Sequence, residues 1–223
     1  MSGAIAVFVK TVGLSPLKTR LAKTIGTENT EAFHLAAAYS VASVAQKLSK
    51  QVELSCYYAV AEETAVEHSD WQGLACIWQG SGGLGERMRL IHQSLLKKHD
   101  FVLLVGADIP QITVSELVKA SAYLMNSSKK RSVLAPSADG GFWLFGSNFA
   151  IPENIWTDVS YSQDDTGKLF LQAIKALAPV KILETLRDVD ELPDLQALQP
   201  VLAKLPQPTQ AQQQLSQFLT TII

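Results

Sequence analysis

Acidic residues follow two apolar stretches of the chain and could bind a divalent cation. Asp108 ends the run FVLLVGAD, and Asp188 and Asp190 lie in the later segment LRDVDELPDL. A continuous apolar run is typical of a strand buried in a parallel sheet, and ligands bind outside the carboxyl ends of such strands. Carboxylates at that edge suit Mg²⁺ or Mn²⁺, which prefer oxygen ligands. Structural alternatives remain open: Asp108 in a turn before Pro110, or an aspartate capping a helix at Glu191.

The segment after the first apolar run carries only positive charge. Lys10, Lys18 and Arg20 lie in KTVGLSPLKTR, and residues 1–26 contain no aspartate or glutamate. Lysine and arginine beside the free N–H groups of a helix start form an anion-binding site, for which phosphate is the natural ligand. The pattern GxxxxGK[ST] of a P-loop is absent. This segment is therefore predicted to bind the phosphates of a nucleotide, and a solvated basic loop is the structural alternative.

A glycine-rich loop, QGSGGLGERM, separates a β-like run from a helical one. Gly80, Gly82 and Gly85 have the GxGxxG spacing of dinucleotide-binding proteins, which would indicate an NAD-dependent oxidoreductase. That motif usually follows the first strand, where this chain has its basic loop. The loop equally fits a segment near a bound nucleotide, with Gly82 and Gly83 beside the ligand and Arg87 directed at anionic groups.

A third acidic position lies in PSADGGFWLFG. Asp139 precedes Gly140 and Gly141, which allow the backbone to approach another group closely, and Phe142 and Trp143 follow. A pocket for a sugar or an acceptor would suit this combination, with Asp139 as a catalytic residue. A tight hairpin turn is the structural alternative.

Strand-like runs alternate with helical ones, which predicts a mostly parallel sheet with helices on both faces, a three-layer α/β/α fold. The alternation breaks at residues 140–147, where one antiparallel strand is expected. We predict one domain over residues 1–223, in which 205–223 form a terminal helix packed on the body or on a second subunit of a homodimer. The expected strands are 4–9, 52–60, 75–80, 101–108, 131–137, 140–147 and 180–184, and the main helices are 27–50, 84–99, 113–125, 164–178 and 191–205.

Composition argues against several classes of protein. The 223 residues carry a net charge of −2, which is unlike the basic surface of a nucleic-acid-binding protein. No apolar run has membrane-spanning length, and the N-terminus does not resemble a signal peptide, so a cytoplasmic protein without membrane or nucleic-acid partners is expected. Cys56 and Cys76 are expected to be free thiols, because neither belongs to a CxxC motif.

Five segments together resemble a known family: KTVGLSPLKTRLA, GGLGERM, VGADIP, SADGGFWLFG and DVDELPDL, in this order between residues 4 and 195. They resemble an uncharacterised bacterial family of radical-SAM/selenodomain-associated transferases. That family is similar to the nucleotide-diphospho-sugar transferases with the glycosyltransferase-A fold, which include molybdenum-cofactor and phospholactate guanylyltransferases. The resemblance implies that Lys18 and Arg20 bind the donor's phosphates and that Asp108 and Asp190 bind the metal ion.

The chain departs from the family pattern at Val12, where proline is usual, and at Phe142–Trp143, where tyrosine is common; the second departure leaves the acceptor undefined. The expected function is a metal-dependent transferase that uses a nucleotide triphosphate or a nucleotide-sugar donor and a small-molecule acceptor. Glycosyl transfer would release a nucleoside diphosphate, and nucleotidyl transfer would release pyrophosphate. The family favours the first reaction and the basic loop the second. An NAD-dependent oxidoreductase and a non-catalytic nucleotide-binding protein stay as alternatives.

Overall fold

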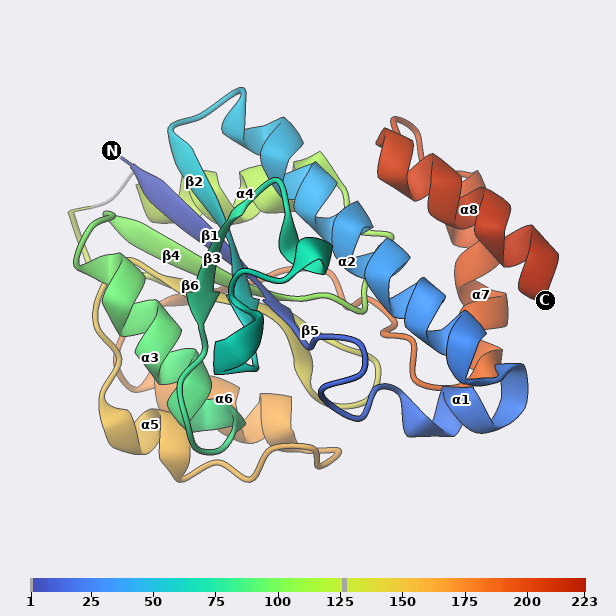
Figure 1. Cartoon of the computed structure of the whole chain (residues 1–223). Helices are drawn as coiled ribbons and strands as arrows, with labels where there is room; N and C mark the ends of the chain where they lie inside the picture. Colours follow the sequence, from blue (N-terminus) through green and yellow to red (C-terminus); the bar gives the residue numbers. More distant parts are fainter. Residues whose placement is uncertain (1, 126–127) are drawn as a thin grey trace.

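A seven-stranded sheet forms the centre of the molecule (Figure 1). The computed structural model describes residues 2–125 and 128–223. The strands lie in the order β3-β2-β1-β4-β6-β5-β7, and β6 is antiparallel to both of its neighbours while the other pairs are parallel. The predicted sheet with one antiparallel strand is thereby confirmed. The strands are β1 Gly3–Val9, β2 Leu54–Val60, β3 Ala75–Trp78, β4 Phe101–Gly106, β5 Ser132–Pro136, β6 Phe142–Ser147 and β7 Val180–Ile182.

Helices cover both faces of the sheet, as the alternation of elements predicts. Helices α2 and α4 pack on one face, and α3, α5 and α6 pack on the other. The α-helices are α1 Thr19–Ile25, α2 Thr27–Ser49, α3 Leu84–Leu96, α4 Val114–Met125, α5 Glu153–Thr157, α6 Thr166–Lys175, α7 Leu192–Ala203 and α8 Gln210–Ile222, with two short 3₁₀ helices at Glu63–Ala65 and Ser69–Trp71. Helix α5 has no counterpart among the predicted elements; it buries Trp156 against the sheet.

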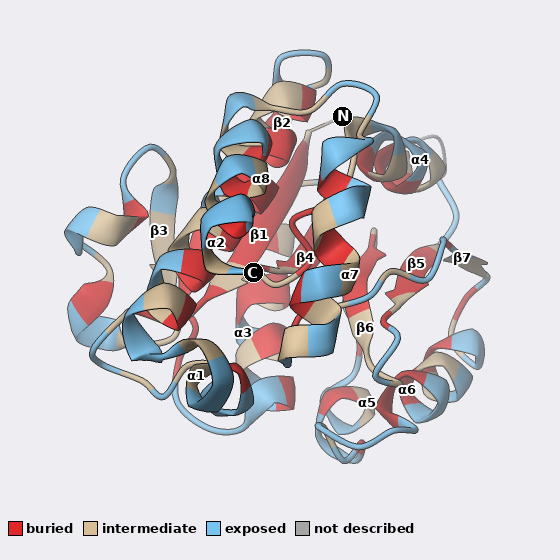
Figure 2. Ribbon diagram, turned by 90° about the vertical axis from the view of Figure 1, so that its right-hand side faces the viewer, coloured by how far each residue is buried: buried red, intermediate tan, exposed pale blue. Residues whose placement is uncertain are grey.

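The central strands are apolar on both sides because both of their faces are buried (Figure 2). In β1, Ile5 joins the core under α2 while Ala6 joins the core under α3, and in β4 Leu103 and Leu104 divide in the same way. This is the alternation of side chains expected along a strand. Two covered faces hold β1 and β4 firmly, so residues that follow these strands have defined positions.

The C-terminal helix packs on its own chain. Helix α8 begins at Gln210, later than the predicted 205, and contacts α2 and α7. Leu215 and Leu219 are fully buried in a third apolar cluster that also contains Phe33 of α2. These contacts are with the body of its own chain, and a contact with a second subunit stays a prediction. Within the described residues, no helix combines the length and apolar character needed to cross a membrane.

The last strand is shorter than predicted. Strand β7 ends at Ile182, and only an isolated bridge between Leu186 and Ser137 continues the pairing. Asp188 and Asp190 follow the apolar run as predicted, but they lie in an irregular segment several residues beyond the end of β7. Strand β7 lies at one edge of the sheet, and among the described residues only β5 pairs with it.

Candidate active site

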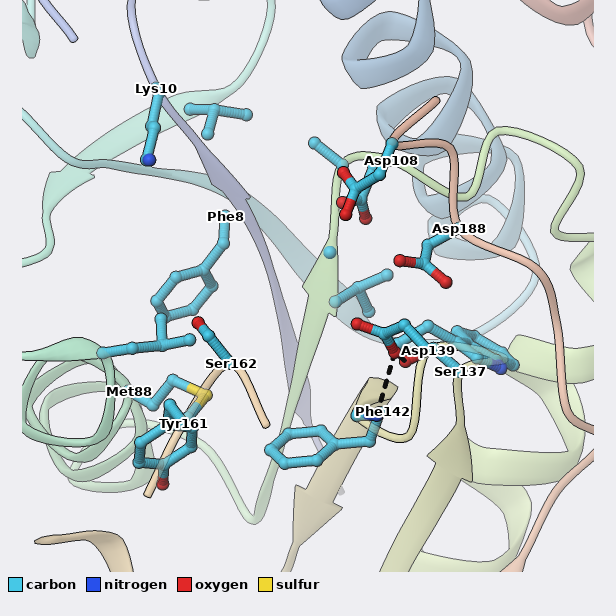
Figure 3. Close-up of a pocket in the computed structure, with 18 of the residues that line it drawn as sticks. Phe8, Lys10, Met88, Asp108, Ser137, Asp139, Phe142, Tyr161, Ser162 and Asp188 are labelled. Atoms are coloured by element: carbon cyan, nitrogen blue, oxygen red, sulfur yellow. Dashed lines mark hydrogen bonds between the residues drawn. The ribbon is translucent and has the colours of Figure 1, made fainter. Parts of the chain in front are cut away.

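A cavity of about 590 Å³ opens at the carboxyl ends of β1 and β4 (Figure 3). This is the edge of a parallel sheet at which ligands usually bind. Its lining brings together Lys10, Lys18, Asp108 and Asp139, all of which were predicted site residues, and adds Asp188. The cavity therefore unites residues from widely separated parts of the chain.

Three carboxylates converge at this cavity. Asp108, Asp188 and Asp190 each offer one oxygen, and these oxygens lie within 4.8 Å of one another. The backbone creates the proximity, because the Val189 N–H donates a hydrogen bond to the Asp108 carbonyl oxygen at 3.2 Å. The sequence offered Asp188 and Asp190 together as candidates for a second carboxylate near Asp108, and both belong to the group.

Neither Asp188 nor Asp190 caps the helix that follows them. Glu191 occupies the N-cap of α7, and the Asp194 carboxylate accepts hydrogen bonds from the N–H groups of Asp190 at 3.1 Å and Glu191 at 2.9 Å. The capping alternative is therefore wrong, and the carboxylates of Asp188 and Asp190 are left to face the cavity.

The Lys18 ammonium lies among these acids. Its Nζ is 3.4 Å from Asp108 Oδ2 and 3.2 Å from Asp190 Oδ1, and it also donates to the Val189 carbonyl oxygen. Burial on its own would lower the pKa of Lys18, but the charges of Asp108 and Asp190 outweigh burial and raise that pKa above its ordinary value. The side chain is only 9% exposed and stays positively charged.

The backbone at Lys18 is unusual. Lys18 precedes α1 with a φ of 36°, in the left-handed region that side chains other than glycine rarely adopt. Such a conformation costs free energy and persists where surrounding contacts fix it. Here the hydrogen bonds of the ammonium supply those contacts, so the loop after β1 is shaped to bring this amine to the acids.

Among the described residues, no cation forms an ion pair with Asp188. Burial, followed by the nearby charges of Asp139 and Asp108, raises the pKa of the Asp188 carboxyl to about 6, from an ordinary value of 3.8. Lys18 contacts the other two acids of the group but is not a partner of Asp188. The carboxyl therefore changes charge close to neutral pH.

Replacing Asp188 by asparagine should alter how stability depends on pH. Because folding raises the pKa of this carboxyl, its ionisation costs stability as pH rises from about 4 to about 6. Asparagine cannot ionise, so Asp188→Asn avoids this loss of stability. The difference in unfolding temperature, variant minus wild type, should increase as pH rises over that range and stay constant at higher pH. The measurement is thermal unfolding of both proteins in EDTA from pH 4.5 to 7.5. Parallel pH profiles would show that Asp188 ionises normally.

Arg20 is not brought to the cavity. Its guanidinium contacts Glu191 at 2.9 Å and Asp190 at 3.5 Å, and 66% of its side chain is exposed. Arg20 does not line the cavity. It holds the acidic segment from outside, so a role in phosphate binding remains a prediction without geometric support.

The glycine-rich loop has structural reasons for its glycines. Glu86 Oε2 accepts the Gly83 N–H at 2.6 Å, and a Cβ on Gly82 would lie 2.2 Å from the same oxygen. A Cβ on Gly85 would lie 2.0 Å from the Trp156 carbonyl oxygen, so this glycine allows α3 to pack against α5. Gly82 and Gly83 do not line the cavity, whereas Arg87 does. The loop also follows β3, an edge strand, so these observations do not favour a dinucleotide site.

Asp139 combines a turn with a position on the cavity. Its Oδ1 accepts hydrogen bonds from the Ser137 hydroxyl at 2.6 Å and the Gly141 N–H at 2.8 Å, as in a tight turn. Gly140 has a φ of 91°, and a Cβ there would lie 1.9 Å from the Asp164 carbonyl oxygen. One carboxylate oxygen of Asp139 thus stabilises the turn, as the hairpin alternative predicted. The side chain also lies on the cavity wall beside Asp188 (Figure 3).

The opposite wall is apolar. Phe8, Met88, Phe142 and Tyr161 lie across the cavity from the carboxylates (Figure 3). Phe142 stacks on Phe170 of α6 with ring centroids 4.9 Å apart, which fixes its ring. Both residues of the predicted aromatic pair line the cavity. The Phe142 ring lies on this wall, while the indole of Trp143 is buried and donates to the Glu184 carbonyl oxygen.

The further residues that line the cavity include three that were not predicted as site residues: His34, Gln79 and Ser162. His34 of α2 contacts the Lys10 carbonyl oxygen through Nε2 at 2.8 Å, and burial lowers its pKa. Ser162 has a φ of 62° and Gln79 is 4% exposed. The position of Gln79 directly after β3 is the one signal that could have identified it, because strand ends form this edge of the sheet.

Comparison with known proteins gives the family. Residues 40–163, more than half of the chain, match the family described as "Uncharacterized protein conserved in bacteria (DUF2064)". The chain belongs to the DUF2064 family. None of the curated proteins matches the sequence. The finer likeness to radical-SAM/selenodomain-associated transferases stays a prediction.

The fold of this DUF2064 protein is shared with solved structures. A candidate nucleotide-diphospho-sugar transferase from Desulfovibrio desulfuricans G20 is 19% identical, with a TM-score of 0.82 over 100% of this chain and 99% of that one. A cytidylyltransferase from Leptospira borgpetersenii serovar Hardjo-bovis (strain JB197) is 12% identical, with a TM-score of 0.56 over 99% and 94% of the two chains. CMP:2-keto-3-deoxy-manno-octonic acid synthetase, complexed with CTP, is 10% identical, with a TM-score of 0.55 over 92% and 99%. These likenesses confirm the predicted fold.

Proposed function

We propose that this protein is a metal-dependent transferase that takes a nucleotide-activated donor and a small-molecule acceptor. The observation that carries the proposal is the convergence of Asp108, Asp188 and Asp190 at the cavity, with the Lys18 ammonium beside them. The fold shared with a candidate nucleotide-diphospho-sugar transferase and with a synthetase bound to CTP supports a nucleotide as the donor.

The three acids fit a divalent cation. Their oxygens lie within 4.8 Å of one another, and carboxylate oxygen is the ligand that Mg²⁺ and Mn²⁺ prefer. When bound, the ion would neutralise the donor's phosphates and the charge that develops on the leaving group. Asp108 and Asp190 would hold it as predicted, with Asp188 as a third ligand.

The remaining side chains would position the two substrates. Lys10, Lys18 and Arg87 are the lysine and arginine residues among the described residues that line the cavity. Lys18 and Arg87 would bind the donor's phosphates, and Lys10 would bind another part of the donor nucleotide. Asp139 and the apolar wall would face the acceptor. Burial raises the pKa of Cys56 to about 11, and neither cysteine lines the cavity, so no thiolate nucleophile is available to the donor. Rate enhancement would come from positioning and electrostatics.

Glycosyl transfer is the first candidate reaction. Lys18 is bound to two acids and Arg20 lies outside the cavity, which leaves Arg87 as the phosphate-binding cation of the lining without an acidic partner among the described residues. That positive charge better matches the diphosphate of a nucleotide sugar than a triphosphate. Nucleotidyl transfer is the second candidate, favoured by the many positive charges of the segment after β1 and by the CTP-bound synthetase of similar fold.

A ligand panel with product analysis tests the proposal. Thermal unfolding is measured with nucleoside triphosphates and nucleotide sugars, each with Mg²⁺, with Mn²⁺ and with EDTA. We expect a donor that raises the unfolding temperature only when metal is present. Incubation of that donor with acceptor mixtures should then release a nucleoside diphosphate for glycosyl transfer or pyrophosphate for nucleotidyl transfer. Failure of every nucleotide to stabilise the protein in the presence of metal would refute the proposal, and stabilisation by NAD without metal would favour an oxidoreductase.

A further inference from the structure

The amide of Gln79 joins the ends of two strands at the edge of the cavity. Gln79 directly follows β3, is 4% exposed and lines the cavity. Its Nε2 donates hydrogen bonds to the Val9 carbonyl oxygen at 3.2 Å and the Ala59 carbonyl oxygen at 2.8 Å. An amide nitrogen has two hydrogens, so both are used, and a flipped amide would place its oxygen against two carbonyl oxygens. The orientation of this side chain is therefore fixed.

The oxygen of the same amide is left without a donor. Among the described residues, no group donates a hydrogen bond to Gln79 Oε1. The buried polar atoms without a partner do not include this oxygen, so it remains accessible to solvent. Gln212 offers a direct comparison, since its Nε2 also bridges two carbonyl oxygens, those of Pro110 at 2.8 Å and Ile112 at 2.9 Å. The Gln212 Oε1, however, accepts the Thr209 N–H at 2.9 Å. Gln79 is thus a rigid amide whose one unused acceptor is open to the cavity.

The distance from the acids suits a nucleotide. The Gln79 amide lies at the ends of β1 and β2, whereas Asp108 follows β4 on the other side of β1. Adjacent strands are about 4.8 Å apart, so two strand spacings give about 10 Å between the acids and the amide. A nucleotide with its phosphates near Lys18 can reach Gln79 with its base.

On the basis of the proposed function, we propose that Gln79 Oε1 accepts a hydrogen bond from the exocyclic amino group of the donor's base, and that this base is guanine or cytosine. Uracil has no amino group. Its N3–H could donate to Gln79 Oε1, but this N–H lies between two carbonyl groups. Their oxygens would then be brought against Gln79 Oε1 and the Val9 carbonyl oxygen, which repel them. The exposed Lys10 ammonium also lies over the cavity (Figure 3), where it can donate to a base carbonyl. Guanine and cytosine carry an amino group and a carbonyl on one edge, whereas adenine has no carbonyl.

Base discrimination by the intact protein tests this proposal. Dissociation constants of GTP, ITP, CTP, UTP and ATP are measured by isothermal titration calorimetry with Mg²⁺. ITP differs from GTP by the missing 2-amino group, and UTP has a carbonyl where CTP has its amino group. We expect GTP to bind roughly tenfold or more tightly than ITP, or CTP than UTP by the same factor, since a buried acceptor is left unpaired by the weaker ligand. ATP should bind more weakly than the preferred nucleotide.

A pair of matched variants separates recognition from packing. Gln79→Met should reduce the preference to less than about threefold, because the acceptor is gone. Gln212→Met loses the same two-carbonyl bridge away from the cavity and should keep the wild-type preference.

Equal binding of GTP and ITP together with equal binding of CTP and UTP would overturn the inference, as would a preference that survives in Gln79→Met. The comparison on wild type decides the matter even if Gln79→Met does not fold. If none of the five nucleotides binds, the proposed function fails together with the inference. If they bind without base preference, the inference fails and the proposed function stands.

Discussion

Replacement of Asp108 by asparagine is expected to reduce kcat/KM about 100- to 1000-fold, the loss found when one group that stabilises charge at a reacting centre is removed. Asp108 is the acid that the rigid end of β4 places in the three-carboxylate group. Asparagine has nearly the same shape but no charge, so it should also weaken Mn²⁺ binding by at least about tenfold. Manganese affinity is measured by electron paramagnetic resonance of free Mn²⁺, and turnover by release of the nucleotide product.

The fold should survive this substitution, which makes the result interpretable. Asp108 contacts Lys18 at 3.4 Å, but 40% of its side chain is exposed, so the lost ion pair should cost only about 1 kcal/mol. Asp158→Asn is the matched control, because Asp158 is exposed at the end of α5 and does not line the cavity. Unchanged Mn²⁺ affinity in Asp108→Asn would mean that the acids do not form a metal site.

The fold could be predicted from sequence because its central strands are buried on both faces. In β1 and β4 every residue from Ala4 to Val7 and from Phe101 to Val105 is apolar or small, so the strands stand out without any alternation. Strand β7 lacked this signal, since it is a three-residue edge strand with partly exposed side chains. Its length depends on pairing with β5, which the local sequence does not encode.

The candidate site could be predicted in part for a related reason. Asp108 follows a strand, so its position depends on the fold alone, and the rule that ligands bind at strand ends was sufficient. The position of Arg20 could not be predicted in the same way. Its guanidinium contacts Glu191, and no local sequence pattern specifies where the irregular segment before α7 places that residue. Gln79 was missed because its chemistry arises from two carbonyl groups, at Val9 and Ala59, that only the assembled sheet brings to it.

Replacement of Lys18 by methionine is expected to change metal binding and catalysis in opposite directions. The ammonium neutralises Asp108 and Asp190, so without it the two acids repel each other and attract a divalent ion more strongly. Mn²⁺ should bind to the nucleotide-free variant about tenfold or more tightly, since an opposing charge about 3 Å away is worth at least ~1 kcal/mol even in water. Turnover should fall about 100-fold or more, because the same amine would bind the donor's phosphates.

The stability of Lys18→Met should depend on whether a divalent ion is bound. In EDTA, Lys18→Met should unfold about 1–2 kcal/mol more easily than wild type, less than for a fully buried pair because 40% and 37% of the two acidic side chains are exposed. Saturating Mn²⁺ should recover most of that loss, since a divalent ion can replace the missing charge. Lys23→Met, an exposed change in helix α1, which follows Lys18 directly, is the matched control and should alter neither property. If Lys18→Met binds Mn²⁺ no more tightly than wild type, the ammonium and the metal do not share these carboxylates. Tighter Mn²⁺ binding together with reduced turnover, the expected result, would indicate that Lys18 binds the donor's phosphates. In that case the metal site is intact and only the contact with the phosphates is missing.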